Sequence, residues 1–202
     1  MTSSFPTKML YEFHLTTRPL AAEALPGFID LCRAVGGKAV LIALPQGVHS
    51  QQPMLSFVCD EPSWAAAQAR LTALAQTFTA AGFAIIREKA EIPADCAAEF
   101  HRAEAQQPAG YFEWHGKIRC SATDIPAYQA LGEKHGARLS ANTLQGQADK
   151  RFLTLRQRGS HAAFMEKVRA LCDALPQPAH LLKQHYEYCV YDSRIALDDG
   201  WI

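Results

Sequence analysis

The chain has 202 residues, with 20 Lys and Arg against 20 Asp and Glu, so its formal net charge is zero. An even charge balance creates no field that attracts a polyanion, and nucleic acid is therefore not an expected partner. The sequence has no run of about 18 apolar residues and no export signal, so we expect a cytoplasmic protein with no membrane partner.

The elements expected from hydrophobic periodicity and turn residues form the same series twice. The first unit, residues 8–92, contains a strand (10–16), a helix (20–35), two strands (38–45 and 53–59), a helix (64–80) and a strand (83–92). A linker over 93–109 leads to the second unit, residues 110–191, with a strand (111–118), a helix (124–134), two strands (137–145 and 150–157), a helix (161–174) and a strand (180–191). Residues 192–202 are expected to form a C-terminal tail.

A residue-by-residue match indicates that the second unit is a copy of the first. Tyr11-Glu12-Phe13-His14 returns as Phe112-Glu113-Trp114-His115, and residues 63–74 match residues 160–171. The separation between matched residues falls at successive connections, as it does when insertions and deletions are confined to loops. We predict an α+β fold: a tandem duplication of a ferredoxin-like βαββαβ unit, with two antiparallel sheets, each in the order 4-1-3-2 and with helices on one face.

Side chains alternate between the two faces of a strand, which sorts the polar residues of each unit. The outer strands place corresponding sets on the open faces, away from the helices: Glu12, His14, Arg87, Lys89 and Glu91, and then Glu113, His115, Lys183, His185 and Glu187. The middle strand is expected to add Ala39, Leu41 and Ala43 in the first unit and Arg138, Ser140 and Asn142 in the second. If the open faces turn toward each other, these residues line a cleft. A polar open face is also what an antiparallel sheet presents to water.

The paired Glu-x-His motifs favour acid–base chemistry, because a histidine oriented by a carboxylate can act as a general base near neutral pH. The predicted catalytic residues are His115, Glu113, His14, Glu12, His185 and Glu187. The predicted substrate-binding residues are Arg138, Arg156, Lys117, Lys183 and Asn142, which suit an anionic group. The sequence therefore indicates an enzyme that acts on a small anionic molecule without a cofactor. It leaves the reaction and the oligomeric state open.

Two other chemistries use the same residues. Glu12, His14, Glu113 and His115 offer two imidazoles and two carboxylates, which suit a divalent metal, although the nearby cations would repel it. His14-Leu15-Thr16 also resembles half of the signature of the two-histidine phosphoesterases, which carry H-x-T or H-x-S on a strand of each of two lobes. The resemblance implies a hydrolase acting on a cyclic phosphate. The second copy, His115-Gly116-Lys117, departs from it because lysine replaces the hydroxyl residue.

A third alternative is a protein without catalytic activity. Tandem ferredoxin-like proteins also serve as small-ligand-binding or regulatory modules, and fold alone does not separate these roles from catalysis. An anion or a metal ion bound between the two open faces would distinguish the alternatives.

Overall fold

The structure is a computed structural model that describes residues 8–43, 51–104, 110–145, 149–176 and 181–195. The first repeat contains β1 (Met9–Thr17), α1 (Leu25–Ala34), β2 (Lys38–Ala43), β3 (Gln51–Glu61), α2 (Trp64–Ala80) and β4 (Ile85–Pro93). The connection contains α3 (Ala97–Ala103). The second repeat contains β5 (Tyr111–Arg119), α4 (Ile125–His135), β6 (Ala137–Asn142), β7 (Lys150–Gln157), α5 (His161–Asp173) and β8 (Leu181–Asp192). Short 3-10 turns precede α1, α3 and α4, and another follows β6: Ala22–Ala24, Ala94–Cys96, Ala122–Asp124 and Thr143–Gln145.

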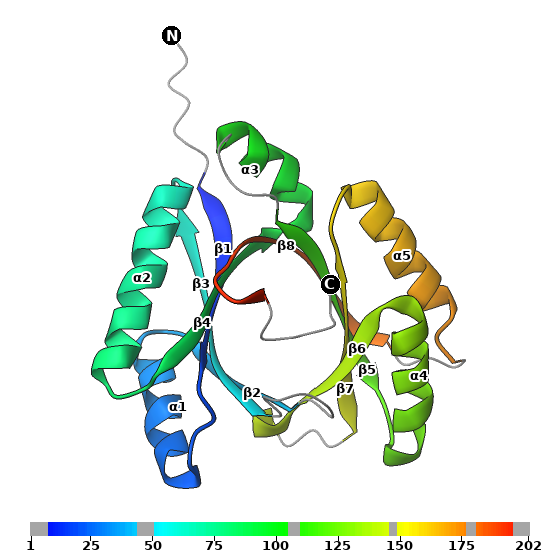
Figure 1. Ribbon diagram of the computed structural model, residues 1–202, viewed down its shortest axis with the longest axis horizontal. Coiled ribbons are helices and arrows are strands. Elements are labelled where there is room, and N and C mark those ends of the chain that lie inside the picture. The colour runs from blue at the N-terminus through cyan, green and yellow to red at the C-terminus, as the bar shows by residue number, and fades with distance from the viewer. Residues whose placement is uncertain (1–7, 44–50, 105–109, 146–148, 177–180, 196–202) are drawn as a thin grey trace.

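The eight strands form one closed barrel in the order β1-β3-β2-β6-β7-β5-β8-β4. Figure 1 shows this ring of strands with the helices on its outside. Within each repeat the order is 4-1-3-2, and the tandem ferredoxin-like α+β fold predicted from the sequence is confirmed.

The two sheets of the sequence-based prediction are not separate, because their edge strands pair with each other. The β2–β6 seam is short, with Ile42 opposite Asn142 and Ala43 opposite Ala141. The β4–β8 seam is longer and runs from Lys89 opposite Asp192 to Pro93 opposite Glu187. An edge strand carries backbone N–H and C=O groups without partners, and closing the barrel satisfies them.

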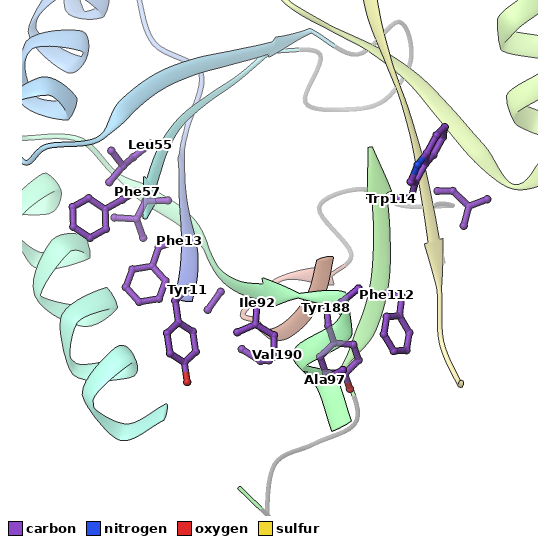
Figure 2. Close-up of a cluster of buried hydrophobic side chains, with 14 of the residues drawn as sticks. Tyr11, Phe13, Leu55, Phe57, Ile92, Ala97, Phe112, Trp114, Tyr188 and Val190 are labelled. Carbon is purple, nitrogen blue, oxygen red and sulfur yellow. The ribbon is translucent and has the colours of Figure 1, made fainter. Parts of the chain in front are cut away.

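The hydrophobic core lies outside the barrel, between strands and helices. Figure 2 shows Tyr11, Phe13 and Phe57 on the side of the strands that faces the helices of the first repeat. In the second repeat the ring of Phe112 lies 5.2 Å from that of Phe164 on α5. Because the apolar side chains of the strands point outward to the helices, alternation turns the polar side chains into the barrel.

Serine residues begin the two long helices, as their sequence positions predict. The Ser63 hydroxyl accepts a hydrogen bond from the backbone N–H of Ala66 at the start of α2, and Ser160 accepts from Ala163 at the start of α5. Such caps satisfy N–H groups that have no partner within the helix. All six cysteines are free. Among the described residues, no helix is both long and apolar enough to cross a membrane.

The assignment of faces on β2 was wrong by one residue. Val40 and Ile42 line the interior of the barrel, whereas Ala39 packs against the core beside the helices. The pairing with β3 fixes this register, with Val40 opposite Met54 and Ile42 opposite Gln52. A shift of one residue transfers every side chain of a strand to the other face.

Candidate functional site

The interior of the barrel contains a cavity of about 270 Å³ that residues of both repeats line. It is close to the lower end of the size range of small-molecule pockets, roughly 300–1,000 Å³. Eight of the eleven residues predicted as catalytic or substrate-binding line it: Glu12, His14, Glu113, His115, Asn142, Arg156, His185 and Glu187. The barrel therefore brings together Glu-x-His motifs that lie about a hundred residues apart in the chain.

The other three predicted residues, Lys117, Lys183 and Arg138, are not part of the cavity lining. Lys117 lies opposite Lys183 in the β5–β8 register, and its Nζ is 5.6 Å from the centre of the Phe152 ring. Lys183 is exposed. Alternation along the strands predicts that these three side chains face the barrel interior, but none of them reaches the cavity.

In the first repeat His14 lies between two carboxylates. Its Nε2 is 2.9 Å from Glu91 Oε2 and 3.7 Å from Glu12 Oε1. Glu12 also accepts a hydrogen bond from the Ser56 hydroxyl at 2.7 Å. The other ring nitrogen, Nδ1 of His14, is buried and has no hydrogen-bond partner among the described residues. The first Glu-x-His motif is thus completed by Glu91, a residue of β4.

The second repeat builds the corresponding triad. His115 Nε2 is 3.3 Å from Glu113 Oε1 and 3.4 Å from Glu187 Oε2. His115 Nδ1 is within hydrogen-bond distance of the Thr154 hydroxyl, at 2.9 Å. Glu113 and Glu187 correspond to Glu12 and Glu91, and the cross-strand register is the same in both repeats.

Lys89 connects the two triads. Its ammonium lies 2.6 Å from Glu91 Oε1 and 2.5 Å from Glu113 Oε2. Glu113 also faces two nitrogens of Arg156, with Nε 3.1 Å from Oε2 and Nη2 3.2 Å from Oε1. The Tyr111 ring lies beside both cations, 5.6 Å from Lys89 Nζ and 5.4 Å from Arg156 Cζ. These charges are almost fully removed from solvent, which buried ion pairs tolerate only when each charge has partners.

The four central titratable groups differ in their preferred charge state. Burial disfavours the Glu91 carboxylate, but Lys89 and His14 outweigh it and lower the pKa of Glu91 to about 2. Burial is likewise outweighed at Glu113, where Arg156 and Lys89 hold the pKa well below its usual value.

At Glu187 and His115 the pKa shifts favour the uncharged form, whereas at those two carboxylates they favour the charged form. Burial together with the charges of Glu91 and Glu12 raises the pKa of Glu187 well above its usual value. Burial lowers the pKa of His115, although Glu113 and Glu91 oppose that shift. The site therefore holds ionised carboxylates next to a carboxyl group that retains its proton and a histidine that gives its proton up.

One group of potential metal ligands lies in the cavity. Ligand atoms of Glu91, Glu113 and His115 are all within 4.8 Å of one another. The Lys89 ammonium contacts both carboxylates of this group and supplies the positive charge that a divalent ion would bring. Placing a metal there would require Lys89 to leave, so this set does not favour a metal over the ammonium.

Several residues of the interior were missed as site residues or assigned elsewhere. Lys89 and Glu91 were placed on the correct face but were not predicted to take part in the site. Asp192 was assigned to the tail, whereas it ends β8 and accepts from Arg87 Nε at 2.9 Å and from the Tyr111 hydroxyl at 2.7 Å. The only sequence signal for Tyr111 was its alternation with Glu113. A register shift in the β4–β8 pairing moves Asp192 to the interior, and such a bulge leaves no mark in the sequence.

The cavity wall also has an apolar part, made by Val40, Ile42, Met54 and Phe152. Asn142 also lines the cavity, and its strand β6 is the neighbour of β2, which carries part of this apolar wall. Its Oδ1 accepts from the backbone N–H groups of Leu41 (3.4 Å) and Leu144 (3.2 Å), which leaves its Nδ2 hydrogens as donors. The cavity thus combines a charged part with an apolar part, as small-molecule sites usually do.

Comparisons with known proteins give structural likeness only. No protein-family model matches the sequence. The search of curated proteins finds no match either. A mutant chlorite dismutase from Candidatus Nitrospira defluvii matches at 16% identity and a TM-score of 0.30, over 96% of this chain and 94% of that one. The same enzyme in complex with imidazole matches at 18% identity and 0.31, over 95% and 93%. A putative monooxygenase from Lactobacillus acidophilus NCFM matches at 11% identity and 0.30, over 91% and 93%.

The prediction that no cofactor is needed is corrected by these comparisons, because chlorite dismutases are haem-binding proteins. The residues of the present barrel do not fit a haem. A haem needs a planar space and an axial ligand, whereas this cavity of about 270 Å³ carries four carboxylates on its wall. Nε2 of both His14 and His115 faces carboxylates within 3.4 Å. We therefore derive no step through haem.

Proposed function

We propose that the protein is a small-molecule enzyme that transfers protons on an oxo acid held inside the barrel, with His115 and Glu187 as its acid–base pair. The observation that carries the proposal is the contact of these two side chains in the cavity, Nε2 to Oε2 at 3.4 Å. Burial raises the pKa of Glu187 and lowers that of His115, so both uncharged forms are favoured and the pair combines a carboxyl group that can donate a proton with an imidazole that can accept one.

The substrate class follows from the charges of the lining. With Glu187 protonated, Lys89 and Arg156 face the carboxylates Glu91 and Glu113, whereas Arg87 in the lining is paired with Asp192. Because these three cations already face carboxylates of the protein, neutral hydrogen-bond donors would hold the substrate. The Asn142 amide, the Glu187 carboxyl and His185 are suitable donors in the lining. A small oxo acid meets these conditions, since it has one carboxylate, a carbonyl oxygen that accepts a proton, and acidic C–H bonds.

A phosphoester is a poorer candidate. His14 and His115 do face one cavity, as the resemblance to two-histidine phosphoesterases implies. Each histidine, however, has two carboxylates beside its Nε2, and a phosphate group would bring further negative charge against them. Lys89 and Arg156 do not offset this repulsion, because both are engaged with Glu113.

Solvent deuterium exchange tests the proposal. Pyruvate, 2-oxobutanoate and acetoacetate are incubated with the protein in D2O, and the loss of each C–H signal is followed by proton NMR against the rate without protein. We expect at least one acid to exchange faster with the protein, and Glu187→Gln to abolish the effect. Glu133→Gln, an exposed change on α4, is the matched control and should exchange like the wild type. No acceleration with any of the three acids would refute the proposal.

A further inference from the structure

The duplication gives the barrel two histidine–carboxylate dyads, one from each repeat. His14 and Glu91 form the first, with Nε2 and Oε2 at 2.9 Å, and His115 and Glu187 form the second, at 3.4 Å. Both line the same cavity. The dyads occupy equivalent positions, because β1 and β4 pair in the register in which β5 and β8 pair. A pair of equivalent dyads can serve two chemical steps only if something makes them different.

The difference lies in the residue two positions before the carboxylate on each last strand. In the first repeat it is Lys89, which lies opposite His14 and contacts Glu91 at 2.6 Å. In the second repeat it is His185, which lies opposite His115. Glu91 therefore has an ammonium as its direct partner, whereas Glu187 has no lysine at the equivalent place.

The surroundings of Glu187 are otherwise mainly acidic. Its electrostatic neighbours are Glu12 from β1, Glu91 and Lys89 from β4, and Glu113 from β5. His115 contacts it directly. Lys89 is already engaged by the other two carboxylates, so Glu187 keeps its proton.

We propose that Lys89 divides the work between the dyads: His14, held by Glu91, is the base that removes a proton from carbon, and Glu187, beside His115, is the acid that protonates the substrate's oxygen. The inference rests on the proposed function and extends it to the His14–Glu91 dyad and to a reaction class, the keto–enol tautomerisation of an oxo acid.

The buried Nδ1 of His14 supports the role of base. Nε2 of the ring lies 2.9 Å from Glu91 Oε2, so a proton on Nε2 faces the carboxylate and the lone pair of a neutral His14 is then on Nδ1. That atom is buried and has no hydrogen-bond partner in the described structure, although His14 lines the cavity. A buried polar atom without a partner is unfavourable, and a substrate that presents a proton to it would remove the penalty. The Glu91 carboxylate then stabilises the imidazolium that forms, as the carboxylate of a catalytic triad does.

The reaction is balanced without an external reagent. In the first step the C–H bond next to the carbonyl breaks, its proton goes to His14 Nδ1, and its electron pair forms the C=C bond of the enol. The carbonyl oxygen takes the proton of Glu187. In the second step the enol O–H proton returns to Glu187, and the proton on His14 returns to the carbon that lost it, where the electron pair of the C=C bond forms the new C–H bond and the carbonyl is restored. Both dyads end in their starting states, and exchange of the His14 proton with D2O introduces deuterium.

A swap of the two distinguishing residues tests the division directly. The carboxyl carbons of 13C-labelled glutamate are titrated by NMR in the ligand-free wild type and in the Lys89→His/His185→Lys double variant, with Glu91→Gln and Glu187→Gln used for assignment. In the wild type Glu91 should titrate at lower pH than Glu187, and the swap should reverse the order. An unchanged order would overturn the role of Lys89. If the double variant does not fold, His185→Lys alone should move the Glu187 titration to lower pH, and no movement would have the same meaning.

The His14–Glu91 dyad is tested by the deuterium exchange of pyruvate, 2-oxobutanoate and acetoacetate with Glu91→Gln. Loss of exchange in this variant, with the fold retained by circular dichroism, is the expected result. Exchange at the wild-type rate in Glu91→Gln would overturn the role of the His14–Glu91 dyad and leave the His115–Glu187 site intact. Absence of exchange in the wild type would instead refute the proposed function, so the two failures are distinguishable.

Discussion

Replacing Lys89 by methionine tests the electrostatic centre of the barrel. The ammonium is buried and contacts Glu91 and Glu113 at 2.6 and 2.5 Å, so its removal leaves two carboxylates inside the barrel without their shared cation. Breaking a buried pair in this way costs about 3–5 kcal/mol, a large part of the roughly 5–15 kcal/mol that stabilises a typical domain. We expect the free energy of unfolding at neutral pH, measured by urea denaturation, to fall by about that amount.

The loss of stability caused by Lys89→Met should depend on pH in a direction that the pKa shifts determine. In the wild type the pKa of Glu91 is about 2 and that of Glu113 is also lowered, so their contribution to stability is present above the unfolded value of about 4.3 and is lost as pH falls through the folded values. Without Lys89 both pKa values rise above those of the wild type, although Arg156 still faces Glu113 and His14 still faces Glu91. The difference in the free energy of unfolding between the variant and the wild type should therefore become smaller as the pH is lowered toward about 4.

Lys38→Met is the matched control, because Lys38 is an exposed lysine on β2. This substitution should change the free energy of unfolding by less than about 0.5 kcal/mol at either pH. The electrostatic reasoning would be refuted if the two substitutions lowered the free energy of unfolding equally. It would also be refuted if the loss caused by Lys89→Met grew as the pH falls.

Two further predictions concern Glu187 and the start of β5. Glu187 has a raised folded pKa, so its contribution to stability is present below the unfolded value of about 4.3 and is lost as pH rises through the folded value. The Tm of Glu187→Gln relative to the wild type should consequently increase between about pH 5 and pH 8, and a constant difference would contradict the raised pKa. Gly110→Ala should lower the Tm strongly, because a Cβ there would collide with the backbone oxygen of Cys189; Gly27→Ala, with open space around its Cβ on α1, should be neutral or stabilising by up to about 1 kcal/mol. Similar melts for the two alanine variants would refute the steric argument.

Much of the fold could be predicted because the sequence carries the same information twice. Helix α2 begins after Ser63 and spans the residues predicted for it, since a serine cap and a strong helical pattern coincide there. The closure of the barrel could not be predicted. The β2–β6 seam is formed by backbone hydrogen bonds, and because every residue carries nearly the same backbone groups, the side-chain pattern does not indicate which edge strands pair. The faces of β2 could not be read either, because Ala39-Val40-Leu41-Ile42-Ala43 has no polar residue that would reveal the alternation.

The site was predictable where a strand is regular and its polar residues alternate. Glu113 and His115 are on the predicted face because β5 pairs with β7 without interruption. Lys89 was placed on that face, but its role depends on its reach from β4 to Glu113 on β5, which no pattern along one strand encodes. Asp192 was missed because the register of β8 against β4 shifts before it.

The two seams of the barrel also have a consequence for a single repeat. In a protein made of residues 8–92 alone, β2 and β4 would be unpaired edge strands of the sheet. The carboxylates that line the barrel interior would then lie on an open face of that sheet. Both seams are antiparallel, and strand β2 meets its own copy β6 as β4 meets β8. Such contacts are self-complementary about a two-fold axis, so two separate repeats could close the same barrel as a homodimer. In that dimer each half would have the same side chain at every position, and Glu91 and Glu187 would be one residue in two equal surroundings. Joining the copies in one chain lets a substitution occur in one half alone.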